Sequence, residues 1–346
     1  MIEVDGSKKS GSGTILRMSV ALSAVTGQPL HIYNIRQSRP EPGLKPQHLE
    51  AVLTAAKICS AELKGAELKS RELWFTPGRM KSGRITAEIG TAGSIPMLLM
   101  TVLPICAYAE QPVQLDVFNG GTDVSNSPTI NYVRFVLLPI LKRMDLNASL
   151  IVEKYGYYPK GMGQVTINVE PSRRLKPILL ESFGKLKSVE GISVCTFLAN
   201  RKVAERQAKA ARSYLTQRRT AVSDIQVIND QSNPLQKGSS LVLWAETDSG
   251  ATLGSDAIGQ LGKPSESVGE EAAEKLQSEI SAKATVDLHL ADMLILFMAL
   301  AKGRSAYLTD KLSEHLETNI WLAEKLLDVK FKVEKKGQLL KVEKVS

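Results

Sequence analysis

Apolar and polar positions along the first sixty residues follow two periods. Ile2–Val4 has the short apolar pattern of a strand, and a second strand is predicted over residues 31–36. Ile15–Ala24 is apolar at helical spacing and is followed by Gly27, a residue typical of a helix C-terminus. Prolines then interrupt the chain, and the pattern predicts a helix over residues 47–63.

The same combination of strand, glycine-containing loop and apolar helix recurs further along the chain. Ile85–Ile89 is predicted as a strand and Pro96–Ala109 as a buried helix. Helices are also expected over Asn131–Met144, as a half-buried partner, and over Val286–Ala301. This recurrence suggests degenerate repeats of one α+β unit.

The stretch from residue 184 to 275 has a different pattern. Its expected elements are a strand over Val189–Leu198, a charged helix over 201–219, strands over Ile225–Ile228 and Ser239–Glu246, and a return loop over Gly250–Pro264. We therefore predict a small α/β domain at 184–275, inserted into a larger α+β domain made of residues 1–183 and 276–346.

Composition agrees with a globular protein of more than one folding unit. The chain has 346 residues, which exceeds the usual size of one compact domain. The longest apolar run, near Met293–Ala301, is too short to cross a bilayer, which needs about 20 residues, so no membrane association is expected. The net charge of +8 favours an anionic partner such as nucleic acid or nucleotide, although many basic proteins bind neither.

The N-terminal sequence and the cysteines indicate where the protein works. MIEVDGSKKSGSG lacks the apolar core of a signal peptide. Cys59, Cys106 and Cys195 are widely spaced, so we expect each to pack as a small apolar residue rather than to form a disulfide or a metal site. A reducing, cytoplasmic setting is expected.

His315 is a candidate nucleophile. Ser313 is a suitable N-cap, and an apolar stripe starting at Leu316 predicts a helix with His315 off that stripe, on the side of Asn319. The positive end of the helix dipole would keep the imidazole neutral, and a neutral ring nitrogen can attack phosphorus. The alternative is an ordinary surface histidine near a helix start.

Two further groups are candidates for binding. His289 and Asp292 share one face at the start of an apolar helix, where they could contact a base and a ribose hydroxyl or simply form a polar, capped helix end. A second group could cradle an RNA end or form a solvated basic loop. Its members are Arg17, Arg36, Arg39, Gln47 and His48. Neither the phosphate-binding loop motif nor the dinucleotide fingerprint is present.

Seven segments, in the same order, resemble the RNA 3′-terminal phosphate cyclase family over nearly the whole chain. They are DGSKKSGSGTILR, NIRQSRPEPGLKPQHLEAV, IGTAGSIPMLLMTVLP, NGGTDVSNSPT, YGYYPKGMGQV, HLADMLILFMALA and EHLETNI. The resemblance implies a larger domain of three repeated units, each with two helices and a four-stranded sheet, and a smaller inserted α/β domain.

The resemblance also implies a reaction. Such enzymes use ATP, with a divalent cation (Mg²⁺ or Mn²⁺), to convert an RNA 3′-phosphate into a 2′,3′-cyclic phosphate through a histidine-bound AMP and an RNA-linked AMP. The nucleophilic histidine falls on His315. The residues implied to bind the nucleotide are His289, Leu290, Ala291, Asp292, Met293 and Pro128, and those implied to bind phosphate or RNA are Arg17, Arg36, Arg39, Gln47 and His48.

Three positions depart from the family pattern. Ser10 stands where the family often has a metal-binding glutamate, Met100 where a glutamine is expected, and His289 where some members have a tyrosine. The metal ligands are therefore not assigned. The rival interpretations are a cyclase-like protein that acts in ribosomal RNA processing without catalysis, and another enzyme with similar repeats, such as an enolpyruvyl transferase.

Overall fold

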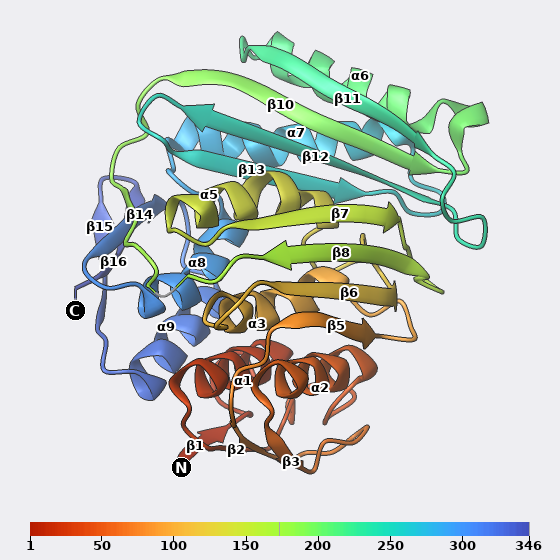
Figure 1. Cartoon of the computed structure of the whole chain (residues 1–346). Coiled ribbons are helices and arrows are strands. Elements are labelled where there is room, and N and C mark those ends of the chain that lie inside the picture. Colours follow the sequence, from red (N-terminus) through yellow and green to blue (C-terminus); the bar gives the residue numbers. More distant parts are fainter. Residues whose placement is uncertain (173, 346) are drawn as a thin grey trace.

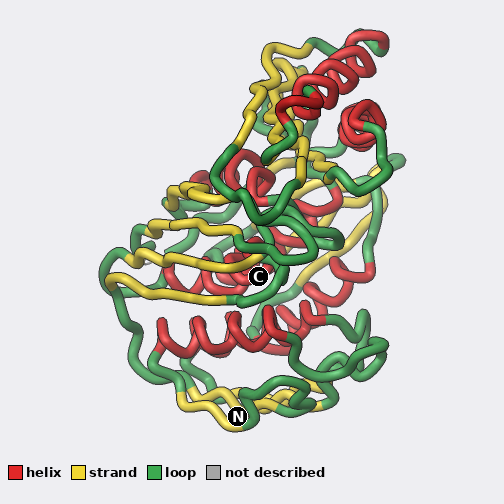
Figure 2. Tube along the Cα trace, turned by 90° about the vertical axis from the view of Figure 1, so that its right-hand side faces the viewer, coloured by secondary structure: helices red, strands yellow, loops and turns green. Residues whose placement is uncertain are grey.

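A computed structural model describes residues 1–172 and 174–345 of the chain. Helices and four-stranded sheets alternate through the described residues, so the fold is mixed, as the α+β prediction requires. In Figure 1 the chain starts at the lower edge of the molecule and the middle of the sequence forms the upper part. Helices lie between and beside the sheets, and the view in Figure 2 shows the same layers from the side.

The N-terminal sheet has the order β1-β2-β4-β3. Its strands are β1 (Ile2–Asp5), β2 (Leu30–Tyr33), β3 (Glu62–Lys64) and β4 (Leu73–Thr76), and the helices of this part are α1 (Gly13–Thr26) and α2 (Pro46–Cys59). β1 and β2 are parallel, whereas the other two pairs are antiparallel. Both helices lie above this sheet in Figure 1.

The next sheet has the order β5-β6-β8-β7, with β5 and β6 parallel and the other pairs antiparallel. Its strands are β5 (Gly83–Glu88), β6 (Val113–Gly120), β7 (Ala148–Lys154) and β8 (Gly163–Val169). Its helices are α3 (Ile95–Ala107), α4 (Ile130–Tyr132) and α5 (Leu138–Arg143), the last two joined by a π-helical turn over Val133–Leu137.

The C-terminal sheet has the order β15-β16-β14-β9, in which only β9 and β14 are parallel. Its strands are β9 (Leu179–Leu180), β14 (Ser305–Thr309), β15 (Phe331–Lys336) and β16 (Leu339–Lys344), and its helices are α8 (Leu288–Leu300) and α9 (Glu314–Leu326). β9 precedes the rest of this sheet by more than a hundred residues of sequence.

The residues between β9 and α8 form a fourth sheet, with the order β11-β10-β12-β13. Its strands are β10 (Leu186–Thr196), β11 (Val222–Asp230), β12 (Gly238–Thr247) and β13 (Thr252–Ile258), and its helices are α6 (Val203–Gln217) and α7 (Ser265–Ala282). α6 and α7 pack against each other on one face of this sheet, at the top of Figure 1.

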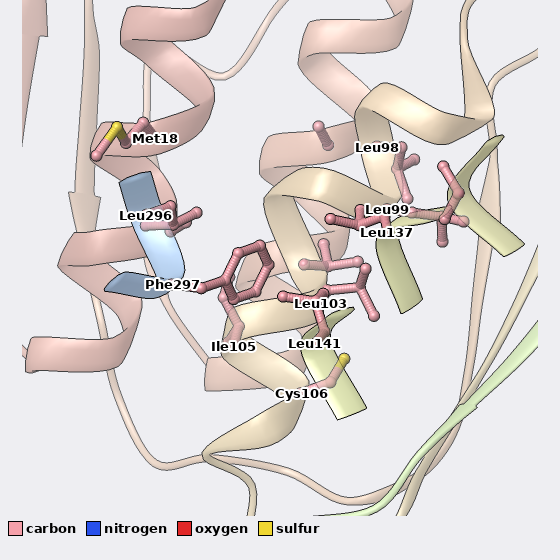
Figure 3. Packing of buried hydrophobic residues seen from close by; sticks show 14 of the residues in the cluster. Met18, Leu98, Leu99, Leu103, Ile105, Cys106, Leu137, Leu141, Leu296 and Phe297 are labelled. Carbon is pink, nitrogen blue, oxygen red and sulfur yellow. The ribbon is translucent and has the colours of Figure 1, made fainter. Parts of the chain in front are cut away.

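The largest apolar core joins helices that are distant in sequence. Figure 3 shows buried side chains of α1, α3, α5 and α8, among them Met18, Leu103, Leu141 and Phe297, in one cluster. Burial of side chains of this size stabilises a fold by about 1.5–3 kcal/mol each. Cys59, Cys106 and Cys195 are free and buried, as predicted, with Cys106 inside this cluster.

One contact of the fourth sheet with the rest of the molecule is made by β13. A methyl group on Gly254 would lie 2.6 Å from Val136 and 2.7 Å from Tyr132, so only glycine permits this approach. The Gly254 amide donates to Asp287 (2.8 Å), which also accepts a hydrogen bond from the Tyr132 hydroxyl (2.7 Å). Buried Asp287 therefore fixes β13, α4 and α8 relative to one another.

Several predicted boundaries were wrong. The expected loop Gly250–Pro264 contains β13, a buried strand paired with β12. The helix expected over 47–63 ends at Cys59, because Ser60 is left-handed, and β3 follows. The strand expected over 31–36 ends at Tyr33, since Asn34 and Arg36 have φ of 53° and 55°.

Two other predictions need adjustment. The helix expected over Asn131–Met144 is present but is interrupted by the π-helical turn, and much of it is buried. The predicted domain boundary at residue 275 falls inside α7. Because α7 packs against α6, β12 and β13, a division at 275 would separate half of a helix from the sheet that it covers.

Candidate active site

Helix N-termini from distant parts of the chain surround one cavity of about 900 Å³. The residues at these helix starts are Ser12 (α1), Lys45 (α2), Ser94 (α3), Asp287 (α8) and Ser313 (α9). α1 packs against α2, α3 and α9, and α8 packs against α9, as Figure 1 shows. Unpaired backbone N–H groups and helix dipoles make such a junction suited to anions.

We describe the cavity by two sides. The α1–α2 wall contains Arg17, Gln47 and His48, together with Arg36 and Arg39 from the loop before α2. The α8–α9 wall contains His289, Asp292, Met293, His315 and Asn319. All of these except Asn319 were predicted from the sequence as site residues, and the predicted Pro128 also lines the cavity. The structure thus brings together ten of the twelve predicted residues.

His315 occupies the second helical position of α9 and is exposed to the cavity. Ser313 caps this helix as predicted, accepting from the Leu316 amide (2.9 Å). Partial desolvation by the cavity walls and the positive charges of Arg17 and Arg39 lower the pKa of His315. The imidazole is therefore neutral at neutral pH and keeps one ring nitrogen with a free lone pair.

Thr14 connects the two walls and was not identified from the sequence. Its hydroxyl lies 3.5 Å from Nδ1 of His315 and accepts a hydrogen bond from Nη2 of Arg17 (3.2 Å). When Nδ1 of His315 carries the proton and points it at this oxygen, Nε2 is the nitrogen left free. Thr14 is thus placed to hold the orientation of the His315 ring.

His48 is buried deep in the α1–α2 wall. Its Nδ1 accepts from the Lys45 amide (3.4 Å), and a methyl group on Gly13 would lie only 2.2 Å from its Nε2. Burial and the nearby charges of Arg17, Arg36 and Lys45 lower the pKa of His48 to about 2. This ring therefore stays neutral over the whole physiological range.

The three arginines have different surroundings. Burial, followed by the charge of Arg36, lowers the pKa of Arg17 to about 10, which still leaves it charged. Arg36 is 8% exposed, and its Nη1 donates to the carbonyls of Glu41 (2.6 Å) and Gly43 (2.8 Å). Arg39 is exposed and donates to the Ser10 carbonyl (3.1 Å). Arg36 therefore holds a loop together, while Arg39 is the freer of the two.

Gln47 joins two segments at the rim of the cavity. Its Oε1 accepts from the Ser94 amide (2.8 Å) at the start of α3. The Ser94 hydroxyl pairs with that of Ser127 (2.5 Å), next to Pro128. The side chain of Gln47 thus fixes the position of the loop that carries Pro128.

The polar groups of the α8–α9 wall connect α8 to α9. Asp292 accepts a hydrogen bond from the Ser313 hydroxyl (2.5 Å), and its backbone carbonyl accepts from Asn319 (2.8 Å). Burial raises the pKa of Asp292 to about 6. The capping residue of α8 is Asp287, which accepts from the amide of His289 (2.9 Å), so neither His289 nor Asp292 serves as a cap.

Apolar side chains from several elements also line the cavity. They are Met97, Met100, Met293, Leu296 and Pro128. Together with the exposed ring of His289 they form a surface suited to a nucleobase. Leu290 and Ala291 do not line the cavity, because both are fully buried and belong to the core-facing side of α8.

The cavity does not fit a protein-bound divalent cation. Among residues 1–172 and 174–345, no group of three or more His, Cys, Asp or Glu could hold a metal ion. Ser10 is not a cavity residue, and its backbone amide donates to Thr318 (3.2 Å). Of the cavity carboxylates, Glu271 is bridged by Lys263 and Lys275, and Asp256 accepts from the Thr129 amide (2.7 Å).

Some cavity residues were missed by sequence reasoning. They are Thr14, Lys45, Asp256, Glu271 and Lys275. Asp256 and Lys275 come from β13 and α7, so the fourth sheet and its helices close one side of the cavity. The sequence offered one signal for Thr14, a serine suited to cap a helix just before it. Ser12 does cap α1, accepting from the Thr14 amide.

No helix within the described ranges has both the length and the apolar character needed to span a membrane.

Comparison with known proteins identifies the family. Residues 8–333 match the sequence model of a family described as RNA 3′-terminal phosphate cyclase. The protein of that name from Pyrobaculum aerophilum is 45% identical over 339 residues, covering 97% of this chain and 96% of the relative. Those from Methanopyrus kandleri and Nitrosospira multiformis are 44% and 39% identical, covering 99% of this chain and 98% and 96% of the relatives. The chain therefore belongs to the RNA 3′-terminal phosphate cyclase family.

Proposed function

We propose that this chain is an ATP-dependent enzyme that converts an RNA 3′-phosphate into a 2′,3′-cyclic phosphate. The observation that carries the proposal is the position of His315, a neutral histidine at a helix N-terminus between basic and apolar surfaces of one cavity. A nucleophile that accepts a nucleotide needs this combination of a free lone pair, a site for the base and cations for the phosphates.

In the first step, Nε2 of His315 attacks the α-phosphorus of ATP. A P–N bond forms, the P–O bond to pyrophosphate breaks, and pyrophosphate leaves. Pro128, Met293 and the ring of His289 would hold the adenine, and Asp292 the ribose. Arg17 and Arg39 would stabilise charge that develops on the phosphates. Leu290 and Ala291, being buried, would act only by positioning α8.

In the second step, an oxygen of the RNA 3′-phosphate attacks the same phosphorus. The P–N bond breaks, and His315 returns to its free form while AMP becomes linked to the RNA. In the third step the neighbouring 2′-hydroxyl loses its proton and attacks the activated phosphate, so AMP leaves and the ring closes. Proximity supplies much of this rate, because the hydroxyl and the phosphate belong to one ribose. Gln47, His48 and Arg36 would shape the site that holds this RNA end.

We propose that a divalent cation, Mg²⁺ or Mn²⁺, is held by the triphosphate and water rather than by protein carboxylates. The absence of a ligand cluster in the described residues and the position of Ser10 support this. We also place the enzyme in the cytoplasm, in line with three buried, free cysteines.

We further propose that residues 1–183 and the C-terminal part form three repeated units and that the middle of the chain is inserted into the third. Three sheets have the same order along the sequence and the same parallel edge pair, which supports this. The fourth sheet has a different order. Because α7 covers that sheet, we extend the inserted unit from residue 275 to the end of α7, Ala282.

Incubation with ATP labelled at the α-phosphate tests the proposal. The wild type should retain label, and His315→Ala should retain none while melting at a similar temperature, since His315 is exposed. His31→Ala is a control, because His31 stacks on Trp74 away from the cavity. A wild type that binds RNA but never becomes labelled would support the alternative, a cyclase-like protein without catalytic activity.

A further inference from the structure

A groove separate from the cavity lies beside it and takes no part in the chemistry described so far. It has a volume of about 470 Å³ and is lined by Asp5, Lys8, Lys9, Tyr33, Trp321 and Lys325. Two aromatic side chains and three lysines therefore face one hollow. Lys325 Nζ lies 6.0 Å from the centre of the Trp321 ring, and Lys8 and Lys9 are exposed.

The groove and the cavity share their structural elements. The loop between β1 and α1 presents Lys8 and Lys9 to the groove, and then Ser12 and Gly13 to the cavity. α9 likewise carries His315 on the cavity side and Trp321 on the groove side. Six residues of α-helix rise about 9 Å. A strand of a few nucleotides is therefore long enough to reach from one site to the other.

Contacts at the base of the loop hold the two sites in a fixed relation. The amide of Ser10 donates to Thr318 of α9 (3.2 Å), and its carbonyl accepts from Arg39 (3.1 Å). Oδ1 of Asp5 accepts from the Ser7 amide (3.0 Å) and from Asn34 (3.2 Å), which shapes the start of the loop. Asp5 also makes one side of the groove acidic, a place for a hydroxyl or amino donor rather than for a phosphate.

We propose that this groove binds the single-stranded RNA upstream of the 3′ end that enters the cavity, with a base stacked on Trp321 or Tyr33 and the backbone phosphates at Lys8 and Lys9. Aromatic faces combined with lysines along a groove are the chemistry that holds single-stranded nucleic acid without reading its sequence. The proposal rests on the proposed function, since an RNA end in the cavity requires a path for the rest of the strand.

The backbone of Lys9 supplies a supporting observation and a useful variant. Lys9 has φ of 50°, the left-handed region in which glycine is unstrained and lysine is not. Lys9→Gly would remove the charge and relieve the strain together. A loss of RNA binding in this variant could not be attributed to an unstable fold, provided that its melting temperature is equal to or above that of the wild type.

The test uses the full chain and a 12-nucleotide RNA with a 3′-phosphate and a 5′-fluorophore, with Kd measured by anisotropy. We expect Trp321→Ala to weaken binding about tenfold, within the usual contribution of one stacked base, and Trp321→Phe to retain most of the affinity. Lys9→Gly should lower the slope of log Kd against log salt by about 0.7, as for one lost phosphate contact to a single strand.

Matched controls separate this site from the cavity. Lys64→Ala removes another lysine that lies over a tryptophan, Trp74, at 4.9 Å, and should leave RNA binding unchanged. A dinucleotide with a 3′-phosphate is too short to reach the groove, so its cyclisation should be unaffected in every groove variant, as should labelling by ATP.

Two results would overturn the proposal. One is an unchanged Kd for the 12-nucleotide RNA in both Trp321→Ala and Lys9→Gly. The other is a loss that appears equally with the dinucleotide or with ATP alone, which would assign the groove to the nucleotide instead. Failure of the proposed function is distinguishable, because an unlabelled wild type can still be tested for groove-dependent RNA binding.

Discussion

The two walls of the cavity are both built from helix N-termini, yet they have opposite character. The α1–α2 wall places the guanidinium groups of Arg17 and Arg36 near a buried neutral histidine, His48. The α8–α9 wall combines Met293 and the ring of His289 with one acid, Asp292, which has a raised pKa and is hydrogen-bonded to Ser313. One wall therefore suits phosphates and the other a nucleoside.

The two walls together explain how one cavity can bind both phosphates and a nucleoside. His315 belongs to the α8–α9 wall, but the charges of Arg17 and Arg39 across the cavity help to lower its pKa. The same cations would bind the phosphates that His315 attacks. Basic residues on one side thus bind the substrate and keep the nucleophile on the other side unprotonated.

The largest effect is expected at the closest contact within the α1–α2 wall. Gly13→Ala would place a methyl group 2.2 Å from His48 Nε2 and 3.0 Å from Arg17 Nη1. We expect RNA cyclisation to fall more than a hundredfold and the free energy of unfolding to fall by about 1–3 kcal/mol. In Gly90→Ala, the control, the methyl group meets open space and costs only backbone strain. Normal cyclisation by Gly13→Ala would mean that this wall need not be rigid.

Arg36 and Arg39 should respond differently to removal. Arg36→Ala leaves the carbonyls of Glu41 and Gly43 without their donor and should lower the free energy of unfolding by about 2–4 kcal/mol. Arg39→Ala removes an exposed cation and should slow cyclisation about tenfold or more with little change in melting temperature. Comparison of the two melting curves with the two rates checks this, and equal destabilisation would contradict the distinction.

Thr14→Val tests whether one hydroxyl couples the two walls. The substitution keeps the shape of the side chain but removes the oxygen that lies between His315 and Arg17. We expect the rate of labelling by ATP to fall about tenfold, because the ring of His315 is no longer held in its orientation. Thr14→Ser retains the hydroxyl and should keep most of the rate, whereas equal rates for both variants would exclude this role.

The effect that is smallest at neutral pH concerns acid stability. The pKa of His48 is about 2 in the folded protein and near 6.5 when unfolded, so the unfolded chain takes up a proton first as pH falls. His48 should therefore destabilise the fold below pH 6.5, by up to about 1.4 kcal/mol per pH unit. Chemical denaturation at several pH values gives the free energy of unfolding against pH. Its slope below pH 6.5 should be shallower for His48→Gln than for the wild type. An identical slope would indicate that His48 is not buried.

Sequence reasoning located the cavity better than it described the fold around it. The helix cap at Ser313, the exposed side of α9 and the buried helix α8 were predicted from spacing and confirmed. Thr14 was missed, because its partner His315 meets it only through the packing of α1 against α9.

β13 shows why a strand was predicted as a loop from its composition. Its sequence is rich in Gly, Ser and Asp, which usually marks a loop. Here small residues are required because both faces of the strand are packed closely. Gly254 faces Tyr132, and the Ser255 hydroxyl donates to the Ala272 carbonyl of α7 (2.7 Å). That requirement depends on Tyr132, more than a hundred residues away, and on Ala272 of a later helix, so it is not visible in the local pattern.

The most direct test of the account is mass spectrometry of the protein after incubation with ATP, under conditions that preserve P–N bonds. We expect AMP attached to His315 and to no other histidine, and loss of this adduct when RNA with a 3′-phosphate is added. RNA ends that become cyclic while His315 never carries AMP would contradict it.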